Sequence, residues 1–158
     1  MSGNAIGHAW IEAHIPHKGS MCLLDSVVSW GESSIVCRAC SHLAADNPLR
    51  HGDRLGIANG IEYAAQAMAV HGALLAGSGQ TPSVGFLASV RNVRWSRSRL
   101  DDIGGELTVC AERLSGNELT ILYDFSLLHA ETVLMTGRAA VMLDAGKHLS
   151  FISREQPS

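Results

Sequence analysis

The chain has 158 residues, of which 46% are hydrophobic and 17% charged, proportions typical of a domain with an apolar core and not of a disordered chain. Its formal net charge of −3, with histidine neutral, gives no overall attraction to nucleic acid or to an anionic membrane. The length predicts a single domain over residues 1–158, with a core at about 15–143 and a polar, loose tail at 147–158.

The first part of the chain predicts a short helix and two strands before a long loop. In order, we expect a helix near 9–13, a turn at 15–19, strands at 21–29 and 34–41 joined by a hairpin turn, and a loop at 44–59. A loop of this length commonly carries functional residues.

Residues 61–76 form the most informative element, a helix that is apolar or small all round its axis. Its only strongly polar side chains are Glu62, Gln66 and His71. A helix without a solvated face is enclosed by other structure, and residues four apart lie on the same face. An enclosed acid needs partners or a task, so Glu62 predicts a site; the alternative is an acid that only complements the helix dipole. His71, deep in the helix, is interpreted as a hydrogen-bonded core histidine.

After residue 82 the pattern alternates, which predicts four strands at 84–95, 106–114, 118–128 and 133–143. Their short connections leave no room for parallel crossovers. The predicted fold class is therefore α+β, an antiparallel sheet wrapped round one long central helix. Such a sheet has edges to cover, and pairing with a second copy would cover them.

The cysteines and histidines do not predict a metal site. Cys37 and Cys40 lack a second ligand pair, and the remaining histidines have no metal-ligand spacing. The apolar settings of the cysteines favour reduced thiols and a cytoplasmic location. The first fifteen residues lack a signal-peptide pattern, and no apolar run is long enough to span a membrane.

Four arginines form the only basic concentration in the chain: Arg91, Arg94, Arg97 and Arg99. Because successive residues of a strand face opposite ways, the four cannot all share one face. They are either a solvated strand end or a docking patch for an acidic partner. Nucleic acid is not expected, since no extended basic face or series of stacking aromatics accompanies them.

Several segments together resemble one known family. They are Ile15-Pro16-His17-Lys18 with Met21 to Val27, then Gly60 to Ala67, then Val84 to Leu87, and finally Arg94 to Arg97 followed by Gly104 to Leu107. The resemblance, over about 15–143, is to the hot-dog fold 3-hydroxyacyl-(acyl carrier protein) dehydratases, and within them to a divergent subgroup linked to aryl-polyene-type pathways. It implies a hot-dog fold, no cofactor, and dehydration of a 3-hydroxyacyl thioester on acyl carrier protein to the trans-2-enoyl form.

The chain departs from this family in the loop before the helix. The family's histidine-phenylalanine-proline-glycine motif, which carries the catalytic base, is replaced by a shorter segment at 50–56 that contains His51. His17, in the opening motif, is the other candidate for the base. Each histidine also has a structural alternative, His17 as a partner of a backbone carbonyl and His51 as a loop residue.

Dehydration needs a base for the α-proton, an acid for the hydroxyl and donors for the charge on the thioester oxygen. The resemblance assigns Glu62 to the hydroxyl and His17 or His51 to the α-proton. Amides at Gly60 and Ile61 would bind the oxyanion, and Gln66 would orient Glu62 or the hydroxyl.

The resemblance also implies partners. The active site would lie at a subunit interface of a homodimer, a larger homo-oligomer or a heteromer with a homologue. Acyl carrier protein would dock at Arg91, Arg94 and Arg97. Two alternatives remain open: a hot-dog thioesterase in which Glu62 activates water, and a catalytically silent partner subunit of a dehydratase.

Overall fold

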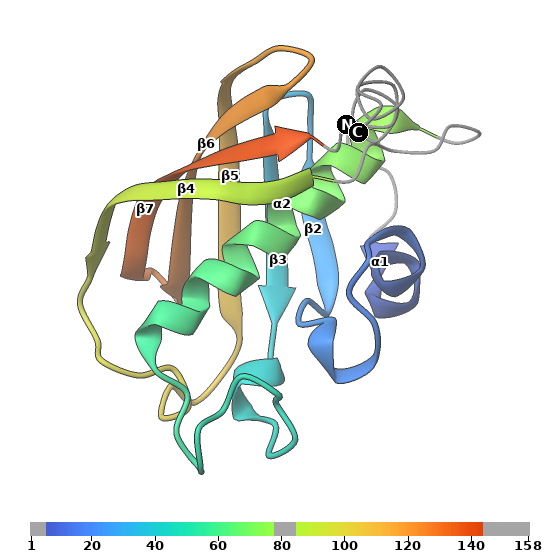
Figure 1. Cartoon of the computed structure of the whole chain (residues 1–158). Helices are drawn as coiled ribbons and strands as arrows, with labels where there is room; N and C mark the ends of the chain where they lie inside the picture. The colour runs from blue at the N-terminus through green and yellow to red at the C-terminus, as the bar shows by residue number, and fades with distance from the viewer. Residues whose placement is uncertain (1–5, 78–84, 144–158) are drawn as a thin grey trace, which may run out of the picture.

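The computed structural model describes residues 6–77 and 85–143, which form a curved antiparallel sheet around one long helix (Figure 1). The elements are β1 (Ile6–Gly7), α1 (His8–His14), the 3-10 turn η1 (Gly19–Met21), β2 (Ser26–Trp30), β3 (Ser34–Ala39), the 3-10 turns η2 (Ser41–Leu43) and η3 (Ile57–Asn59), α2 (Gly60–Ala76), β4 (Gly85–Trp95), β5 (Leu107–Gly116), β6 (Thr120–His129) and β7 (Thr132–Leu143). Among the described residues the sheet has seven strands in the order β1-β2-β3-β5-β6-β7-β4.

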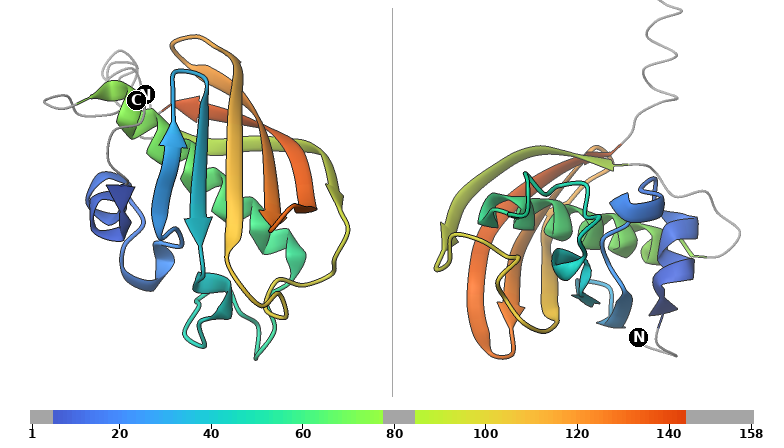
Figure 2. Two further views of the ribbon diagram at one scale, coloured as in Figure 1. Left: turned by 180° about the vertical axis from the view of Figure 1, so that it is seen from behind. Right: turned by 90° about the horizontal axis from the view of Figure 1, so that it is seen from below.

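The sheet curls about α2, and α1 covers the side that the sheet leaves open near β2 (Figure 2). The alternating pattern of the sequence determines which side chains face the helix. In β6, every second residue is buried against the helix, and the residues between them are half-buried on the outer face. The predicted α+β architecture, an antiparallel sheet around a central helix, is confirmed.

Small residues let α2 lie close to the sheet. A Cβ atom at Gly60 would lie 3.0 Å from Leu127 Cδ2 and 3.2 Å from Met135 Sδ, so a larger residue there would force these side chains to shift. Further along the helix, Ala64 and Ala67 are fully buried. The helix ends as predicted at Gly77, whose φ of 77° is readily adopted only by glycine. None of the helices in residues 6–77 and 85–143 is long and apolar enough to cross a membrane.

The predicted elements differ from the structure in three places. The strand expected at 21–29 begins only at Ser26, because the chain before it forms η1 and is bonded to α2. The short strand β1, which pairs with β2, was not predicted. The turn η3 forms at the end of the loop expected at 44–59 and leads directly into α2. The tail expected at 147–158 lies outside the described residues.

Strand β4 is an edge of the described sheet and contains a bulge. Arg91 pairs with Arg138 and Arg94 pairs with Thr136, so two residues of β4 lie opposite one residue of β7. Asn92, within the bulge, has a φ of 58°. Positions 136 and 138 of β7 face the same side, so the bulge brings Arg91 and Arg94 to one face of the sheet.

Candidate active site

A cavity of about 340 Å³ lies between α2, the strands β4, β6 and β7, and the segment that joins α1 to η1. Two of the predicted catalytic residues, His17 and Glu62, line it together. The other lining residues are His14, Ile15, Pro16, Ala65, Met68, Ala69, Gly72, Ala73, Gly85, Phe86, Leu87, Ile121, Tyr123, Val141 and Leu143. Apart from the histidines, Glu62 and the Tyr123 hydroxyl, this lining is apolar. The cavity therefore suits a hydrocarbon chain with polar chemistry at one place.

His17 is held by a compact turn after α1. The Gly19 N–H donates to the Glu12 carboxylate over 2.6 Å, and Lys18 Nζ donates to the carbonyls of Glu12 and Ile15. Ile15 is buried and caps the end of α1. These contacts fix the backbone on both sides of His17. They explain how one residue in an irregular segment presents its ring to the cavity.

The imidazole of His17 is suited to accept a proton. Burial lowers its pKa from the usual 6.5, and the nearby Glu62 carboxylate acts in the opposite direction. The Nδ1 atom is buried and has no hydrogen-bond partner among the described residues. Nδ1 of His17 therefore makes no hydrogen bond to a backbone carbonyl of the described residues, as the structural alternative would require. A ring that stays neutral near pH 7 is available as a general base.

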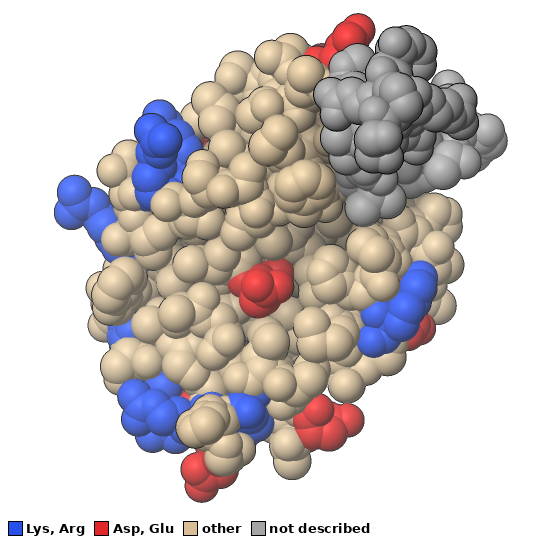
Figure 3. Space-filling view, in the orientation of Figure 1, with Lys and Arg blue, Asp and Glu red and all other residues tan. Residues whose placement is uncertain are grey.

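Glu62 lies in the first turn of α2 and is half-buried. Its side chain contributes to the cavity wall at the end of the helix where the dipole favours a negative charge. Figure 3 shows that the face on which α2 lies open is mostly uncharged, with an acidic group near its centre. An acid in this setting is reachable by a substrate that enters from this face.

Gln66, predicted to orient Glu62 or the substrate hydroxyl, makes its side-chain hydrogen bonds with the backbone. Its side chain is fully buried and does not line the cavity. Its Oε1 accepts the Leu23 N–H over 2.8 Å, and its Nε2 donates to the Met21 carbonyl over 2.7 Å. Because both ends of the amide are used by the backbone, Gln66 ties the segment after His17 to the helix that carries Glu62.

The predicted oxyanion donors, the amides of Gly60 and Ile61, lie at the junction of η3 and α2. The Gly60 N–H is bonded to carbonyls of η3, including that of Ile57. Neither Gly60 nor Ile61 lines the cavity. A 3-10 turn runs directly into α2 and uses the N–H of Gly60, whereas the role of the Ile61 amide stays a prediction.

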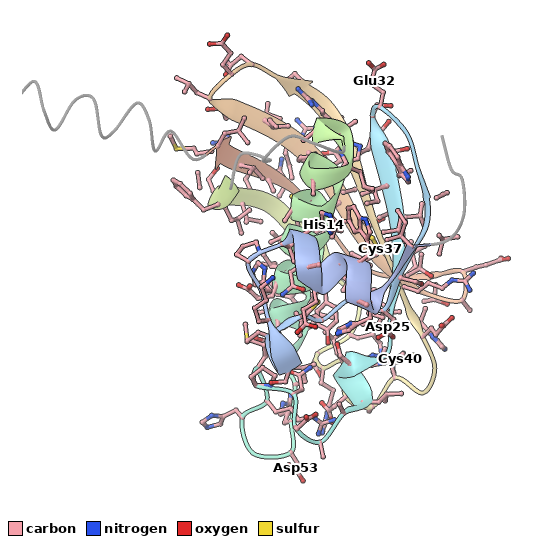
Figure 4. All side chains as sticks on the ribbon, turned by 90° about the vertical axis from the view of Figure 1, so that its right-hand side faces the viewer. His14, Asp25, Glu32, Cys37, Cys40 and Asp53 are labelled. Carbon is pink, nitrogen blue, oxygen red and sulfur yellow. The ribbon has the colours of Figure 1, made fainter. Side chains whose placement is uncertain are left out.

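The structure does not bring His51 to the cavity. His51 is exposed, and its backbone exchanges hydrogen bonds of 2.8 and 3.2 Å with Arg54 around Gly52, whose φ is 68°. Figure 4 shows Asp53 at the tip of this loop, away from His14 on α1. The shortened loop folds back on itself, which directs His51 outward.

Tyr123 is a cavity residue that the sequence did not single out. Its hydroxyl lies 2.7 Å from Nδ1 of His71, whose Nε2 lies 2.7 Å from the Gly31 carbonyl. A carbonyl only accepts, so Nε2 carries the hydrogen and Nδ1 accepts from Tyr123. His71 is thus a hydrogen-bonded core histidine, as predicted. The only signal for Tyr123 was its inward position in the alternating pattern of β6.

The arginine cluster is divided. Arg97 lies 3.9 Å from Asp102, and Arg99 bonds Asp101 through two of its nitrogens. Among the described residues no carboxylate lies within ion-pair distance of Arg91 or Arg94, and both are exposed. Figure 3 shows basic side chains along the edge of the molecule on the β4 side. The predicted docking patch is therefore open at Arg91 and Arg94 and partly neutralised at Arg97.

The cysteines are free thiols: Cys22, Cys37, Cys40 and Cys110. Burial raises the pKa of the Cys37 thiol to about 12. Within residues 6–77 and 85–143, no three histidine, cysteine, aspartate or glutamate side chains gather as a metal site would require.

Comparison with solved structures gives the same fold over most of the chain. The dehydratase heterocomplex ApeI:P from Xenorhabdus doucetiae matches with a TM-score of 0.79 at 22% identity, over 90% of this chain and 96% of that one. A mutant of thioesterase PA1618 from Pseudomonas aeruginosa matches with a TM-score of 0.60 at 15% identity, over 90% and 95%. The PaaI protein of E. coli matches with a TM-score of 0.54 at 16% identity, over 73% and 80%. No curated protein matches the sequence.

These likenesses place the protein in the hot-dog class, as predicted. Within that class, the chain belongs to the ApeP-like family, described as ApeP dehydratase, which matches residues 9–151. The expectation of a dehydratase, a hydro-lyase, is thereby confirmed. The likeness to thioesterase structures concerns the fold alone.

Proposed function

We propose that His17 and Glu62 together carry out the dehydration of a 3-hydroxyacyl thioester to the trans-2-enoyl form. His17 removes the proton from C2 of the acyl chain. The electron pair of that C–H bond forms the C2–C3 double bond, and the hydroxyl leaves C3 as water after Glu62 gives it a proton, directly or through a bound water. The excess proton on His17 returns to Glu62 before the next turnover, so the cycle consumes nothing else.

The observation that carries this assignment is the convergence of His17 and Glu62 on one otherwise apolar cavity. They come from segments 45 positions apart in the sequence. The buried, unpartnered Nδ1 of His17 faces no competing acceptor or donor among the described residues. Two proton-transfer groups with different environments are what a dehydration requires.

We propose acyl carrier protein as the bearer of the substrate. Arg91 and Arg94 are exposed on one face of β4 and suit an acidic surface or a phosphate. Arg97 would contribute less, since Asp102 lies near it. The same strand supplies Gly85, Phe86 and Leu87 to the cavity. A carrier on this face of β4 would be close to the place where its acyl chain has to enter.

We further propose that β4 pairs with a second subunit, either another copy of this chain or a homologue. The strand is an unpaired edge of the described sheet, and Phe86 and Trp95 on it are 55% and 60% exposed. Covering such an edge protects it from non-specific pairing. The related structure described as a dehydratase heterocomplex favours the homologue.

The free thiols support the expected cytoplasmic location.

The test is product analysis with a 3-hydroxyacyl-carrier-protein substrate, for the wild type and the variants Glu62→Gln, His17→Ala and His51→Ala. We expect the wild type and His51→Ala to lose water from the acyl chain, and the other two variants to fall by about 10²-fold or more. Release of free acid in place of water loss would support the thioesterase alternative. Turnover that appears only after a homologous subunit is added, and that survives Glu62→Gln, would assign this chain the role of silent partner.

A further inference from the structure

Gly72 lies in the interior of α2, where glycine destabilises a helix relative to alanine. Its backbone does not have a positive φ. A methyl group placed on Gly72 would have no heavy atom of the described residues within 4 Å, apart from the adjoining backbone of its own helix. Neither backbone conformation nor tight packing within the described chain therefore explains this glycine.

Two other glycines, Gly60 and Gly85, lie where an added side chain would be crowded by neighbouring atoms. A side chain on Gly60 would meet Leu127 at 3.0 Å, and one on Gly85 would meet Val141 at 2.8 Å. At both positions a side chain could be added only if the neighbouring side chain shifted. Gly72 differs from both in facing open space.

That open space is the cavity. Gly72 lines it together with Ala65, Ala69 and Ala73, which lie on the same side of the helix at spacings of three and four residues. The opposite wall is supplied by strand residues: Leu87, Ile121, Tyr123, Val141 and Leu143. Gly72 is ten residues beyond Glu62, which corresponds to roughly 15 Å along the helix.

We infer that Gly72 is a specificity-determining residue: its missing side chain keeps the inner cavity open for the distal part of a long, unbranched acyl chain. The inference rests on the proposed function, which places the reacting carbons beside Glu62 and His17. An extended hydrocarbon chain with C–C bonds of about 1.5 Å advances roughly 1.25 Å per carbon. At that advance 15 Å corresponds to about twelve carbons beyond the reacting pair, so chains of about fourteen or more carbons reach Gly72, and chains of about six do not.

The test is to fill the space. Gly72→Leu places a branched side chain in the path of a long acyl chain and leaves the surroundings of Glu62 unchanged. We expect kcat/KM for a 3-hydroxyacyl chain of about fourteen carbons to fall roughly ten- to hundredfold, and that for a chain of about six carbons to stay within about twofold. Gly104→Leu makes the same change at an exposed site with no atom within 4 Å and should alter neither value.

Binding supplies a readout that does not need turnover. A non-reactive long-chain probe, an acyl-pantetheine with an amide in place of the thioester, is titrated into the wild type and Gly72→Leu. Loss of affinity in Gly72→Leu supports the role of Gly72 even if the wild type catalyses no dehydration, which would count against the proposed function alone. Equal affinity in both proteins, or an equal loss of activity on short and long chains, overturns the inference.

Gly72→Ala checks the thermodynamic premise. If the glycine serves the cavity and not the fold, the alanine variant should unfold at a temperature about 2–4 °C higher, because alanine favours the helix. A lower unfolding temperature would show that the fold itself requires glycine here and would contradict the argument.

Discussion

The side-chain amide of Gln66 accepts a hydrogen bond from the backbone N–H of Leu23 across 43 positions of sequence. The same amide donates to the Met21 carbonyl. This pair of bonds connects the two halves of the site: Gln66 is one helical turn beyond Glu62, and Met21 follows His17 by four residues. The distance between acid and base in the cavity is therefore fixed through a residue that does not touch the substrate.

Replacing Gln66 tests this positioning role. Gln66→Leu leaves the buried Leu23 N–H without its acceptor, which costs about 1–3 kcal/mol of stability, and also removes the donor to the part-buried Met21 carbonyl. We expect kcat to fall by at least about tenfold while KM changes little, since the cavity wall is intact but the acid and base are displaced. Steady-state kinetics together with denaturant unfolding measure both effects.

His42→Leu is the matched control for Gln66→Leu. It also removes a buried hydrogen bond, from Nε2 to the Ile103 carbonyl over 3.0 Å, but it lies outside the cavity lining. An equal drop in kcat in both variants would show that destabilisation alone lowers activity, and Gln66 would then have no positioning role.

The pH dependence of activity follows from the lowered pKa of His17. Because burial lowers that pKa below 6.5, the limb of the kcat/KM profile that rises with pH, on which His17 loses its proton, should be centred below 6.5. The Glu62 carboxylate opposes this shift, so the residual activity of Glu62→Gln should rise at a still lower pH. A limb above pH 7, or one unmoved in Glu62→Gln, would argue against His17 as the base.

The same lowered pKa affects stability. A histidine whose pKa is lower in the folded state binds fewer protons there than when unfolded, so stability increases with pH between the folded-state pKa and 6.5. His17→Ala should reduce the loss of stability on acidification through that window. Denaturant unfolding at pH 5 and pH 8 provides the comparison, and an unchanged pH difference in His17→Ala would contradict the assigned pKa direction.

Docking at β4 predicts a change in carrier recognition without a change in chemistry. Reversing the charges in Arg91→Glu with Arg94→Glu should raise KM for an acyl-carrier-protein substrate by about tenfold or more, and less so at high salt. The same variant should process an acyl-pantetheine normally. The control is Arg38→Glu, which reverses the charge of an exposed arginine on β3. The Nη1 atom of Arg38 lies 3.6 Å from the Glu106 carboxylate. Equal effects of both reversals would place the carrier elsewhere.

The sequence predicted the fold well because its strongest signals are local. In β6, buried and half-buried residues alternate along the strand. In α2, the long stretch without charged residues after Glu62 predicts a helix enclosed by the sheet. The bulge in β4 was missed, because no local pattern distinguishes Asn92 from a regular strand residue. As a result, Arg91 and Arg94 lie on one face although their spacing alone predicts opposite faces.

The sequence singled out two of the residues that line the cavity, and their catalytic roles stay predictions. Glu62 and His17 carry motif signals, and the structure brings them to one cavity. Gln66 also carries a signal, but its partners Met21 and Leu23 are known only once the chain is folded. The outward position of His51 depends on how the shortened loop closes on Arg54, which residue spacing does not determine. Contacts between distant segments therefore account for most of what the sequence left open.

The most direct test of the account is a double-mutant cycle on the dehydration activity of the purified protein. The cycle uses Glu62→Gln, His17→Ala and the combined variant. If the two residues act as one unit in the cavity, each single variant should lose about 10²-fold or more in kcat, and the double variant should be hardly slower than the slower single one. Losses that multiply in the double variant, or a His17→Ala variant that retains wild-type turnover, would contradict a shared catalytic role for His17 and Glu62.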